Sequence, residues 1–267
     1  MVGGATAEAN GSGSLHRGRI IGALKAALEP LHFVDALQES GSAAWGRTDA
    51  WSDIDLNVFV EDGRQEETLR GVEGALQALA PIERTFTEEW PASSATAQRY
   101  YRLEGVSPFL IVDVAVIGRA APDKMLEPEL HGQGIVHFDK TGVTTVPPLD
   151  LTGFEEKRRA RLVQLAGRTE MFHVFVDKEI NRGNWIEAFD NYRAYVLGPL
   201  LELLRMQHRP LHHKFRARYV HYELPADVVA RLQRLLFVRD GPDLVAKHRE
   251  ALDWFRATVT AVRERKG

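Results

Sequence analysis

The chain contains no cysteine, no apolar run of transmembrane length and only a small excess of negative charge. The absence of cysteine among 267 residues excludes disulfides, thiolate nucleophiles and zinc sites with Cys ligands. No apolar run is long enough to cross a membrane, and the start lacks the basic and apolar segments of a signal peptide, so we expect a cytoplasmic protein with no membrane partner. The formal net charge of −3 argues against duplex nucleic acid as the main partner.

The composition, 44% hydrophobic and 27% charged, is that of a globular protein, and the length favours two domains. Alternating or β-branched apolar runs predict strands at Phe33–Gln38, Ile54–Val60, Ile82–Glu88, Gln98–Leu103, Phe109–Ile117 and Ile135–Phe138. Helical spacing predicts helices at Leu15–Leu31, Ala43–Trp51, Gln65–Leu79, Phe154–Leu165, Met171–Asn181, Trp185–Gln207, Ala226–Leu236 and Pro242–Arg263.

The change from strands to helices falls at Pro147-Pro148, which is typical of a linker. We therefore predict an α+β protein with three parts. Residues 1–14, rich in Gly, Ala and Ser, are expected to be disordered. Residues 15–146 are expected to form a mixed β-sheet domain flanked by helices, and residues 147–267 an all-α helical bundle.

The segment from Gly41 to Val60 contains the most informative pattern. A Gly-Ser turn at Gly41-Ser42 precedes Asp53 and Asp55, which begin an apolar run. Residues two apart on a strand point to the same face, and two neighbouring carboxylates repel each other unless a cation lies between them. Carboxylates together with substrate phosphates are the usual ligands of Mg²⁺. The turn offers backbone N–H groups and a hydroxyl that suit those phosphates.

A third carboxylate, Asp113, interrupts the apolar run Phe109–Ile117. A buried carboxylate needs a partner or a metal, so Asp113 is a candidate for metal ligation or base catalysis. The alternative is a strand-end carboxylate paired with an arginine or a backbone N–H.

These residues carry a family resemblance. Gly41, Ser42, Ala44, Gly46, Ser52, Asp53, Ile54, Asp55 and Leu56 match the form G-S-x-A-x-G-x-x-x-x-x-S-D-I-D-L. The segment resembles the DNA polymerase β-like nucleotidyltransferase superfamily, and within it the antibiotic adenylyltransferases of the aminoglycoside type and the minimal nucleotidyltransferases. That resemblance implies a third carboxylate on a neighbouring strand, and helices after the sheet domain that close the substrate cleft.

The resemblance implies transfer of a nucleoside monophosphate, AMP from ATP or another nucleoside triphosphate, with two Mg²⁺ ions held by Asp53, Asp55 and Asp113. Asp113 would be base, ligand or both. A separate base is the other possibility, with Glu88 and Glu89 as candidates at a strand end. Gly41, Ser42 and Ser52 would bind the nucleotide. Arg47 is a further phosphate ligand or an exposed arginine.

Two clusters in the helical half are candidates for binding. Glu187 and Asp190 lie among aromatic residues, which would suit a polycationic, ring-bearing acceptor. The alternative is an amphipathic helix with its charges in water. Lys214 and Arg218 belong to a basic stretch at residues 208–221 that suits a triphosphate, or is a solvated basic face.

The leading prediction is an enzyme that moves AMP from ATP onto a hydroxyl of a small molecule, and the resemblance implies that this acceptor is an aminoglycoside-type antibiotic. The alternative is a minimal nucleotidyltransferase that pairs with or modifies a protein, as antitoxins of this kind do. Such antitoxins are commonly single short domains, whereas this chain has a long helical half attached. Polymerisation or tailing of nucleic acid is disfavoured by the acidic balance of the chain.

Overall fold

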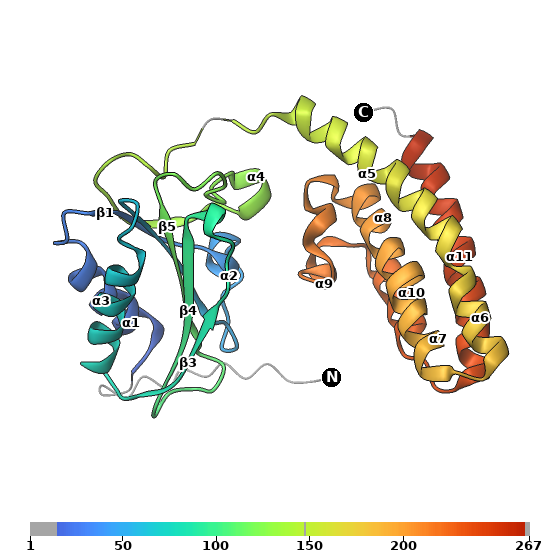
Figure 1. The fold of residues 1–267 in the computed structure, drawn as a ribbon, viewed down its shortest axis with the longest axis horizontal. Coiled ribbons are helices and arrows are strands. Elements are labelled where there is room, and N and C mark those ends of the chain that lie inside the picture. The colour runs from blue at the N-terminus through green and yellow to red at the C-terminus, as the bar shows by residue number, and fades with distance from the viewer. Residues whose placement is uncertain (1–14, 147, 265–267) are drawn as a thin grey trace. The chain divides into compact units, whose positions relative to one another are not determined.

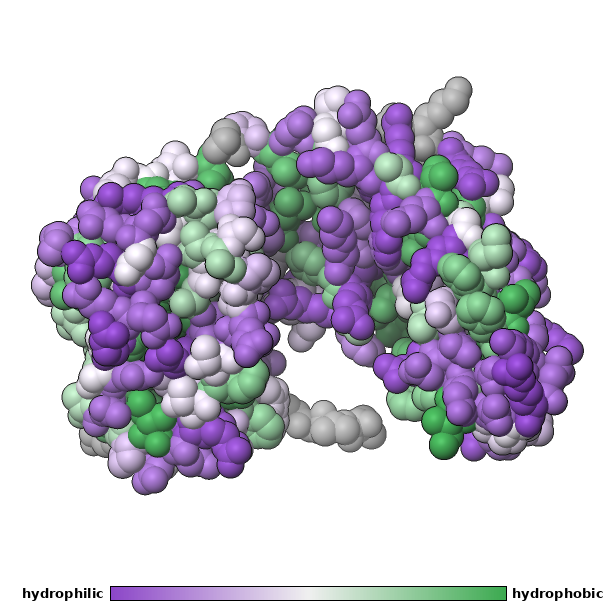
Figure 2. All heavy atoms as spheres, in the orientation of Figure 1, coloured by the Kyte–Doolittle hydropathy of each residue, from purple (hydrophilic) through white to green (hydrophobic). Residues whose placement is uncertain are grey.

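The computed structural model describes residues 15–146 and 148–264. The chain divides into two compact units, residues 1–148 and residues 149–267, and each is described by itself. The segment 1–14, for which the sequence predicts disorder, lies outside the described residues. Hydrophilic side chains predominate on the face drawn in Figure 2, with smaller apolar areas between them. None of the helices in the described ranges has the length and apolar character that a bilayer-spanning segment needs.

The first unit is built on a six-stranded mixed sheet (Figure 1). Its strands are β1 Val34–Glu39, β2 Ile54–Val60, β3 Ile82–Glu88, β4 Thr96–Leu103, β5 Val112–Gly118 and β6 Ile135–Asp139. They follow the spatial order β3-β4-β5-β2-β1-β6. β2 and β5 are parallel neighbours, and the other neighbouring pairs are antiparallel. The sequence predicts all six strands of this mixed α/β unit, with β2 and β3 at the observed bounds.

Helices α1 (Arg17–Leu28) and α3 (Gln65–Gln77) pack together against one face of the sheet. Alternate residues of β2 and β5 are turned to this face, because successive side chains of a strand point in opposite directions. The fully buried centre of this core includes Ile20, Leu24, Leu28, Ile54, Val58, Val60, Leu69, Val72, Leu76, Val112, Val114 and Val116. The other residues of β2 and β5 are therefore left for the opposite face, where the carboxylates lie.

The opposite face is covered only in part. A small apolar cluster covers one end of it and consists of Ala36, Phe59, Ala115, Ile117, Ala121 and Leu126. The short helix α2 (Gly41–Ala44) lies against β2 on this face, and α4 (Pro128–His131) ends beside α2. The part of this face near the beginnings of β2 and β5 carries polar side chains instead of a hydrophobic core.

The second unit is helical in its described residues (Figure 1). Its helices are α5 Leu151–Phe172, α6 Val174–Arg182, α7 Trp185–Tyr192, α8 Gly198–His208, α9 Val220–Glu223, α10 Ala226–Leu236 and α11 Gly241–Glu264. Their apolar stripes meet in one core, with Tyr192, Val196, Leu200, Leu203, Leu235, Ala251 and Phe255 at its centre.

The sequence predicts one helix over Trp185–Gln207, whereas the structure has α7 and α8 separated by a π-helical turn at Arg193–Leu197. Pro199 explains the interruption. Proline has no N–H to donate to the carbonyl of Tyr195 four residues earlier, and its ring crowds that carbonyl, so the wider turn relieves the clash. The sequence also predicts α5 to be shorter than it is. The helix begins at Leu151, where the side chain of Asp150 accepts a hydrogen bond from the Gly153 N–H (3.0 Å).

Candidate active site

Asp55 and Asp113 are paired residues in the parallel β2–β5 ladder. Neighbouring strands are about 4.8 Å apart, and paired residues point to the same face, so the two side chains are neighbours. Each is the second residue of its strand and is half-buried. The structure thus brings two of the three predicted carboxylates together at one edge of the partly open face.

Asp53 lies immediately before β2 and is also half-buried. Its carbonyl accepts a hydrogen bond from the Arg17 guanidinium, which also binds the buried carboxylate of Glu39 through Nε (2.9 Å). The next residue, Ile54, donates its N–H to the Ile111 carbonyl (2.8 Å). The backbone that carries Asp53 is therefore held by both α1 and the segment that precedes β5.

Gly41 packs directly against the Asp55 carboxylate. A Cβ atom on Gly41 would lie 1.8 Å from Oδ2 and 2.4 Å from Cγ of Asp55. The φ of Gly41 is +57°, a conformation that favours glycine. The preceding residue, Ser40, donates its N–H to the Asp55 carbonyl (2.9 Å). The glycine of the Gly-Ser turn is thus required by the close approach of the turn to the carboxylate.

The helix predicted at Ala43–Trp51 is wrong in its position, because the helix is α2, Gly41–Ala44. It ends in a Schellman motif, in which Gly46 donates its N–H to the Ala43 carbonyl (3.0 Å) and Arg47 donates to the Ser42 carbonyl (2.9 Å). Gly46 has φ +63°, the left-handed conformation that this motif needs. The two glycines of the pattern therefore have different roles, one at the carboxylate and one at the helix end.

The hydroxyl of Ser42 is buried and has no hydrogen-bond partner within the described residues. Leaving such a group unsatisfied costs about 1–3 kcal/mol. Ser42 is the residue after Gly41, and Gly41 contacts the Asp55 carboxylate. The unsatisfied hydroxyl therefore belongs to the turn that packs on the carboxylates. A ligand oxygen at this turn would satisfy it.

Ser52 and Arg47 have local partners. The Ser52 hydroxyl donates to the Asp49 carboxylate (2.9 Å) and accepts the Asp49 N–H (2.9 Å), which closes the turn before β2. The Arg47 guanidinium lies over the Trp45 ring, 5.5 Å from its centroid. These contacts give both residues a role in shaping the segment between the Gly-Ser turn and the carboxylates.

Gln98 is a site residue that the sequence did not reveal. Its Nε2 donates to Asp113 Oδ1 (2.7 Å), and its Oε1 accepts the Trp90 indole N–H (3.0 Å). This chain of bonds fixes the rotation of the Asp113 carboxylate. Gln98 lies on β4, the antiparallel neighbour of β5, and only the register between these two strands places it beside Asp113.

Tyr100 is the second site residue that the sequence did not reveal, and it pairs with Asp113 in the β4–β5 ladder. Burial, together with the negative charges of Asp113, Glu88 and Asp55, raises the pKa of Tyr100 to about 12. Glu88 is exposed on β3, where it is paired with Gln98 of β4. The negative charges of the carboxylates therefore add to the larger effect of burial at the Tyr100 phenol.

Alkaline titration is expected to report these charges. Because the phenol of Tyr100 keeps its proton to a higher pH in the folded protein than in the unfolded chain, its contribution to stability is present below pH 10 and is lost as the pH rises toward about 12. Asp113→Asn removes one of the raising charges, so phenolate absorbance should develop at a lower pH in this variant than in wild type. The same shift should be absent when Asp113→Asn is compared with wild type in a Tyr100→Phe background. An unchanged titration in the intact background would show that Asp113 does not act on Tyr100.

A matched pair of glycine variants should separate backbone strain from displacement of Asp55. Gly41 and Gly46 have similar φ values, +57° and +63°, but a Cβ on Gly46 would meet nothing within 4 Å. Gly41→Ala must push the Asp55 carboxylate aside, so catalytic turnover should fall about 100-fold, the scale of a misplacement of 1 Å. Gly46→Ala should lose stability from the strained φ alone and keep most of its turnover. Equal losses of turnover in the two variants would contradict this account.

The predicted residues of the helical half belong to the second unit. A hollow of about 960 Å³ within that unit is lined by Asp190 and Lys214, but not by Glu187 or Arg218. Arg218 instead places its guanidinium over the rings of Phe215 and Tyr219, at 5.9 Å and 5.7 Å. Glu187 is exposed on α7.

The charged lining of this hollow is mostly basic. It comprises Arg161, Arg168, Arg193, Lys214 and Arg216, against Asp190 and Glu202. Arg161 is neutralised by a two-bond ion pair with Glu202 (2.7 and 2.8 Å). The remaining cations make the hollow better suited to an anionic group than to a polycation.

No protein-family model matches the chain, and no curated protein sequence matches it either. Among solved structures, the chain is similar to an aminoglycoside 6-adenyltransferase from Bacillus subtilis, with 13% identity and a TM-score of 0.40 over 94% of this chain and 91% of that one. It is also similar to a spectinomycin adenyltransferase from Enterococcus faecialis solved with ATP and spectinomycin, with 11% identity and a TM-score of 0.34 over 92% of this chain and 98% of that one.

Proposed function

We propose that the protein is a Mg²⁺-dependent nucleotidyltransferase that moves a nucleoside monophosphate, AMP from ATP, onto a hydroxyl of a small molecule of the aminoglycoside type. One observation carries the reaction class. Asp55 and Asp113 are in register on the one parallel pair of the described sheet, with Asp53 just before β2 and Gly41 packed on the Asp55 carboxylate. Chemistry that gathers phosphates and a divalent cation needs such a convergence of carboxylates and a close backbone turn.

The residues present fit Mg²⁺. The donor set consists of carboxylate oxygens, which are hard ligands, and the turn offers the orphan Ser42 hydroxyl for a ligand oxygen beside them. Asp53, Asp55 and Asp113 would hold the two ions. Mg²⁺, when bound, neutralises the charge that develops on the phosphate oxygens during transfer.

The side chains around the carboxylates support the remaining roles. Asp113 accepts the proton of the acceptor hydroxyl, and Gln98 holds its carboxylate in one orientation through the 2.7 Å bond. Gly41 lets the backbone approach a phosphate, and Ser42 donates its hydroxyl to a phosphate oxygen. Glu88, exposed at the end of β3, is the rival base.

The second unit supports two binding roles. Lys214 lines the basic hollow, which favours contact with the anionic triphosphate or pyrophosphate. Arg218, which stacks on aromatic rings outside that lining, is the less favoured phosphate ligand. Glu187 and Asp190 lie one helical turn apart on α7, and an exposed acidic pair of this kind suits an ammonium group of a cationic acceptor, although Asp190 also lines the basic hollow.

A direct assay tests the proposal. The protein is incubated with each nucleoside triphosphate, Mg²⁺ and a panel of aminoglycosides and other hydroxyl-bearing antibiotics, and pyrophosphate release and the product mass are measured. We expect one acceptor class to gain a nucleoside monophosphate, and EDTA to stop the reaction. Addition of the nucleotide to a co-purifying protein, with no small acceptor modified, would overturn the proposal in favour of the partner-modifying alternative.

A further inference from the structure

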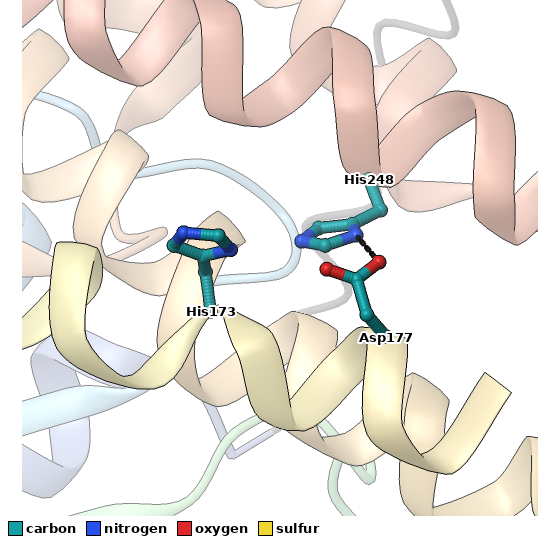
Figure 3. Close-up of side chains that lie close together, drawn as sticks. All are labelled: His173, Asp177 and His248. Carbon is teal, nitrogen blue, oxygen red and sulfur yellow. Dashed lines mark ion pairs between the residues drawn. The ribbon is translucent and has the colours of Figure 1, made fainter. Parts of the chain in front are cut away.

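A cluster of polar side chains is enclosed between helices of the second unit. Its residues are far in sequence from the carboxylates of the first unit. Thr169, His173 and Asp177 follow one another at intervals of four residues along α5 and α6, so they lie on one face of these helices. His173 joins the two helices and keeps helical angles, φ −55° and ψ −29°. His248 on α11 faces them from the other side (Figure 3).

The three side chains drawn in Figure 3 converge. His248 Nδ1 lies 3.3 Å from Asp177 Oδ1. The rings of His173 and His248 have centroids 6.0 Å apart. One ligand atom from each of His173, Asp177 and His248 lies within 4.8 Å of the other two. Two imidazoles and a carboxylate at this separation can reach one ion after small side-chain rotations.

Several buried polar atoms of the cluster lack hydrogen-bond partners among the described residues. His248 is 2% exposed, its Nε2 has no such partner, and its Nδ1 faces the Asp177 carboxylate at 3.3 Å. Nδ1 of His173 and Oγ1 of Thr169 are buried and unpartnered in the same way. Buried polar groups in folded proteins are almost always satisfied, so several orphans in one place indicate a missing ligand.

We propose that His173, Asp177 and His248 form a zinc-type divalent metal site that fastens the α5–α6 helices to α11. Imidazole nitrogen with carboxylate oxygen is a ligand set for Zn²⁺, and not the all-oxygen set that Mg²⁺ prefers. Four ligands at 2.0–2.1 Å from Zn²⁺ are separated by about 3.3 Å, and the distance from His248 Nδ1 to Asp177 Oδ1 matches this separation.

The surroundings of the cluster agree with this assignment. Nε2 of His173 faces the Glu170 carboxylate at 4.0 Å, and metal-binding histidines commonly direct their second nitrogen to a carboxylate. The Asp177 side chain is 55% exposed, which gives an ion a path from solvent and leaves room for water as a fourth ligand.

The simpler alternative is an ion pair between a protonated His248 and Asp177. That arrangement would explain the 3.3 Å contact, but it leaves Nδ1 of His173 buried without a partner. A bound ion satisfies a nitrogen of each ring at once. The site is independent of the proposed transferase activity.

Binding of Zn²⁺ to the full chain tests the proposal. After removal of metal with EDTA, Zn²⁺ alone is titrated by calorimetry, and the melting temperature is followed with and without the ion. We expect one equivalent of Zn²⁺ bound through this site and a higher melting temperature with the ion. His173→Gln and Asp177→Asn change residues with access to solvent, so they should fold. They should bind that equivalent more than about 10-fold more weakly.

Two matched controls locate the ion. Asp55→Asn removes a carboxylate of the first unit, and His131→Gln alters the other described group of potential ligands, Asp123, Glu127 and His131. Both should retain the equivalent lost from His173→Gln and Asp177→Asn. Co²⁺ should give the intense visible absorption of a four-coordinate site in wild type and in both controls. Unchanged Zn²⁺ binding in His173→Gln and Asp177→Asn would overturn the proposal, as would loss of the same equivalent in Asp55→Asn or His131→Gln.

Discussion

Replacing Asp55 by asparagine is expected to lower the proposed nucleotidyl transfer by about 10²–10³-fold, the scale seen when an electrostatic group of a catalytic site is removed. Asparagine has the same shape but no charge, so it removes an anionic ligand of the proposed Mg²⁺ site without opening a cavity. The melting temperature should stay the same or rise slightly, because Asp55 no longer repels the neighbouring Asp113. Turnover is measured by pyrophosphate release with the acceptor identified in the panel, and stability by thermal unfolding.

The same result is expected for Asp53→Asn and Asp113→Asn, and Glu83→Gln serves as the control. Glu83 lies on the edge strand β3, where it is exposed and paired with Arg102 at 3.3 Å. Its variant should keep wild-type turnover, since it changes one charge of the same unit outside the cluster. If Asp55→Asn kept more than about a tenth of wild-type turnover, its assignment as a metal ligand would be wrong.

Glu223→Gln is expected to destabilise the second unit by about 3–5 kcal/mol, the cost of leaving the other member of a buried ion pair without its partner. The Glu223 carboxylate accepts a hydrogen bond from Arg205 Nη1 (2.7 Å) and contacts His212 Nδ1 (3.0 Å). The side chains of Arg205 and Glu223 are both fully buried. Chemical denaturation measures the loss directly.

Glu250→Gln is the matched control. Glu250 also contacts two cations, Arg231 (3.1 Å) and Arg234 (3.0 Å), but all three side chains are more than a third exposed. Its variant should lose less than about 1 kcal/mol. Equal losses in Glu223→Gln and Glu250→Gln would show that burial does not set the strength of the Arg205–Glu223 pair.

The buried pair also predicts an acid response. Burial alone would raise the pKa of Glu223, but Arg205 and His212 together lower it from its ordinary 4.5. A lowered pKa contributes stability above pH 4.5 that is lost as the pH falls through the folded-state value. The stability difference between wild type and Glu223→Gln should therefore shrink in acid.

Patterns local in sequence predicted the elements of this chain well. β2 was predicted at Ile54–Val60 because its apolar run is bounded by polar turns on both sides. β5 begins at Val112 and not at Phe109, because Phe109 is half exposed and its carbonyl accepts the Ile111 N–H in a tight turn. Asp113 stood out because a charge interrupts an apolar strand.

Features that depend on packing were not predictable in this way. Gln98 reaches Asp113 only because of the register in which β4 pairs with β5, and the sequence of neither strand predicts that register. The basic stretch at residues 208–221 was predicted either to contact a triphosphate or to be a solvated basic face. Neither prediction anticipates that its two adjacent histidines, His212 and His213, are buried and that His212 contacts Glu223 of the Arg205–Glu223 pair. His173 and His248 are far apart in sequence, and only the packing of α11 brings their rings together.

The parallel pairing of β2 with β5 also has a consequence for the order of events during folding. Parallel neighbours cannot be joined by a hairpin, and here α3, β3 and β4 intervene between them. Closing so long a loop is entropically costly and slow relative to forming helices and hairpins. A refolding chain should therefore regain most of its circular dichroism before Asp55 meets Asp113, and recovery of Mg²⁺ affinity should lag behind recovery of secondary structure.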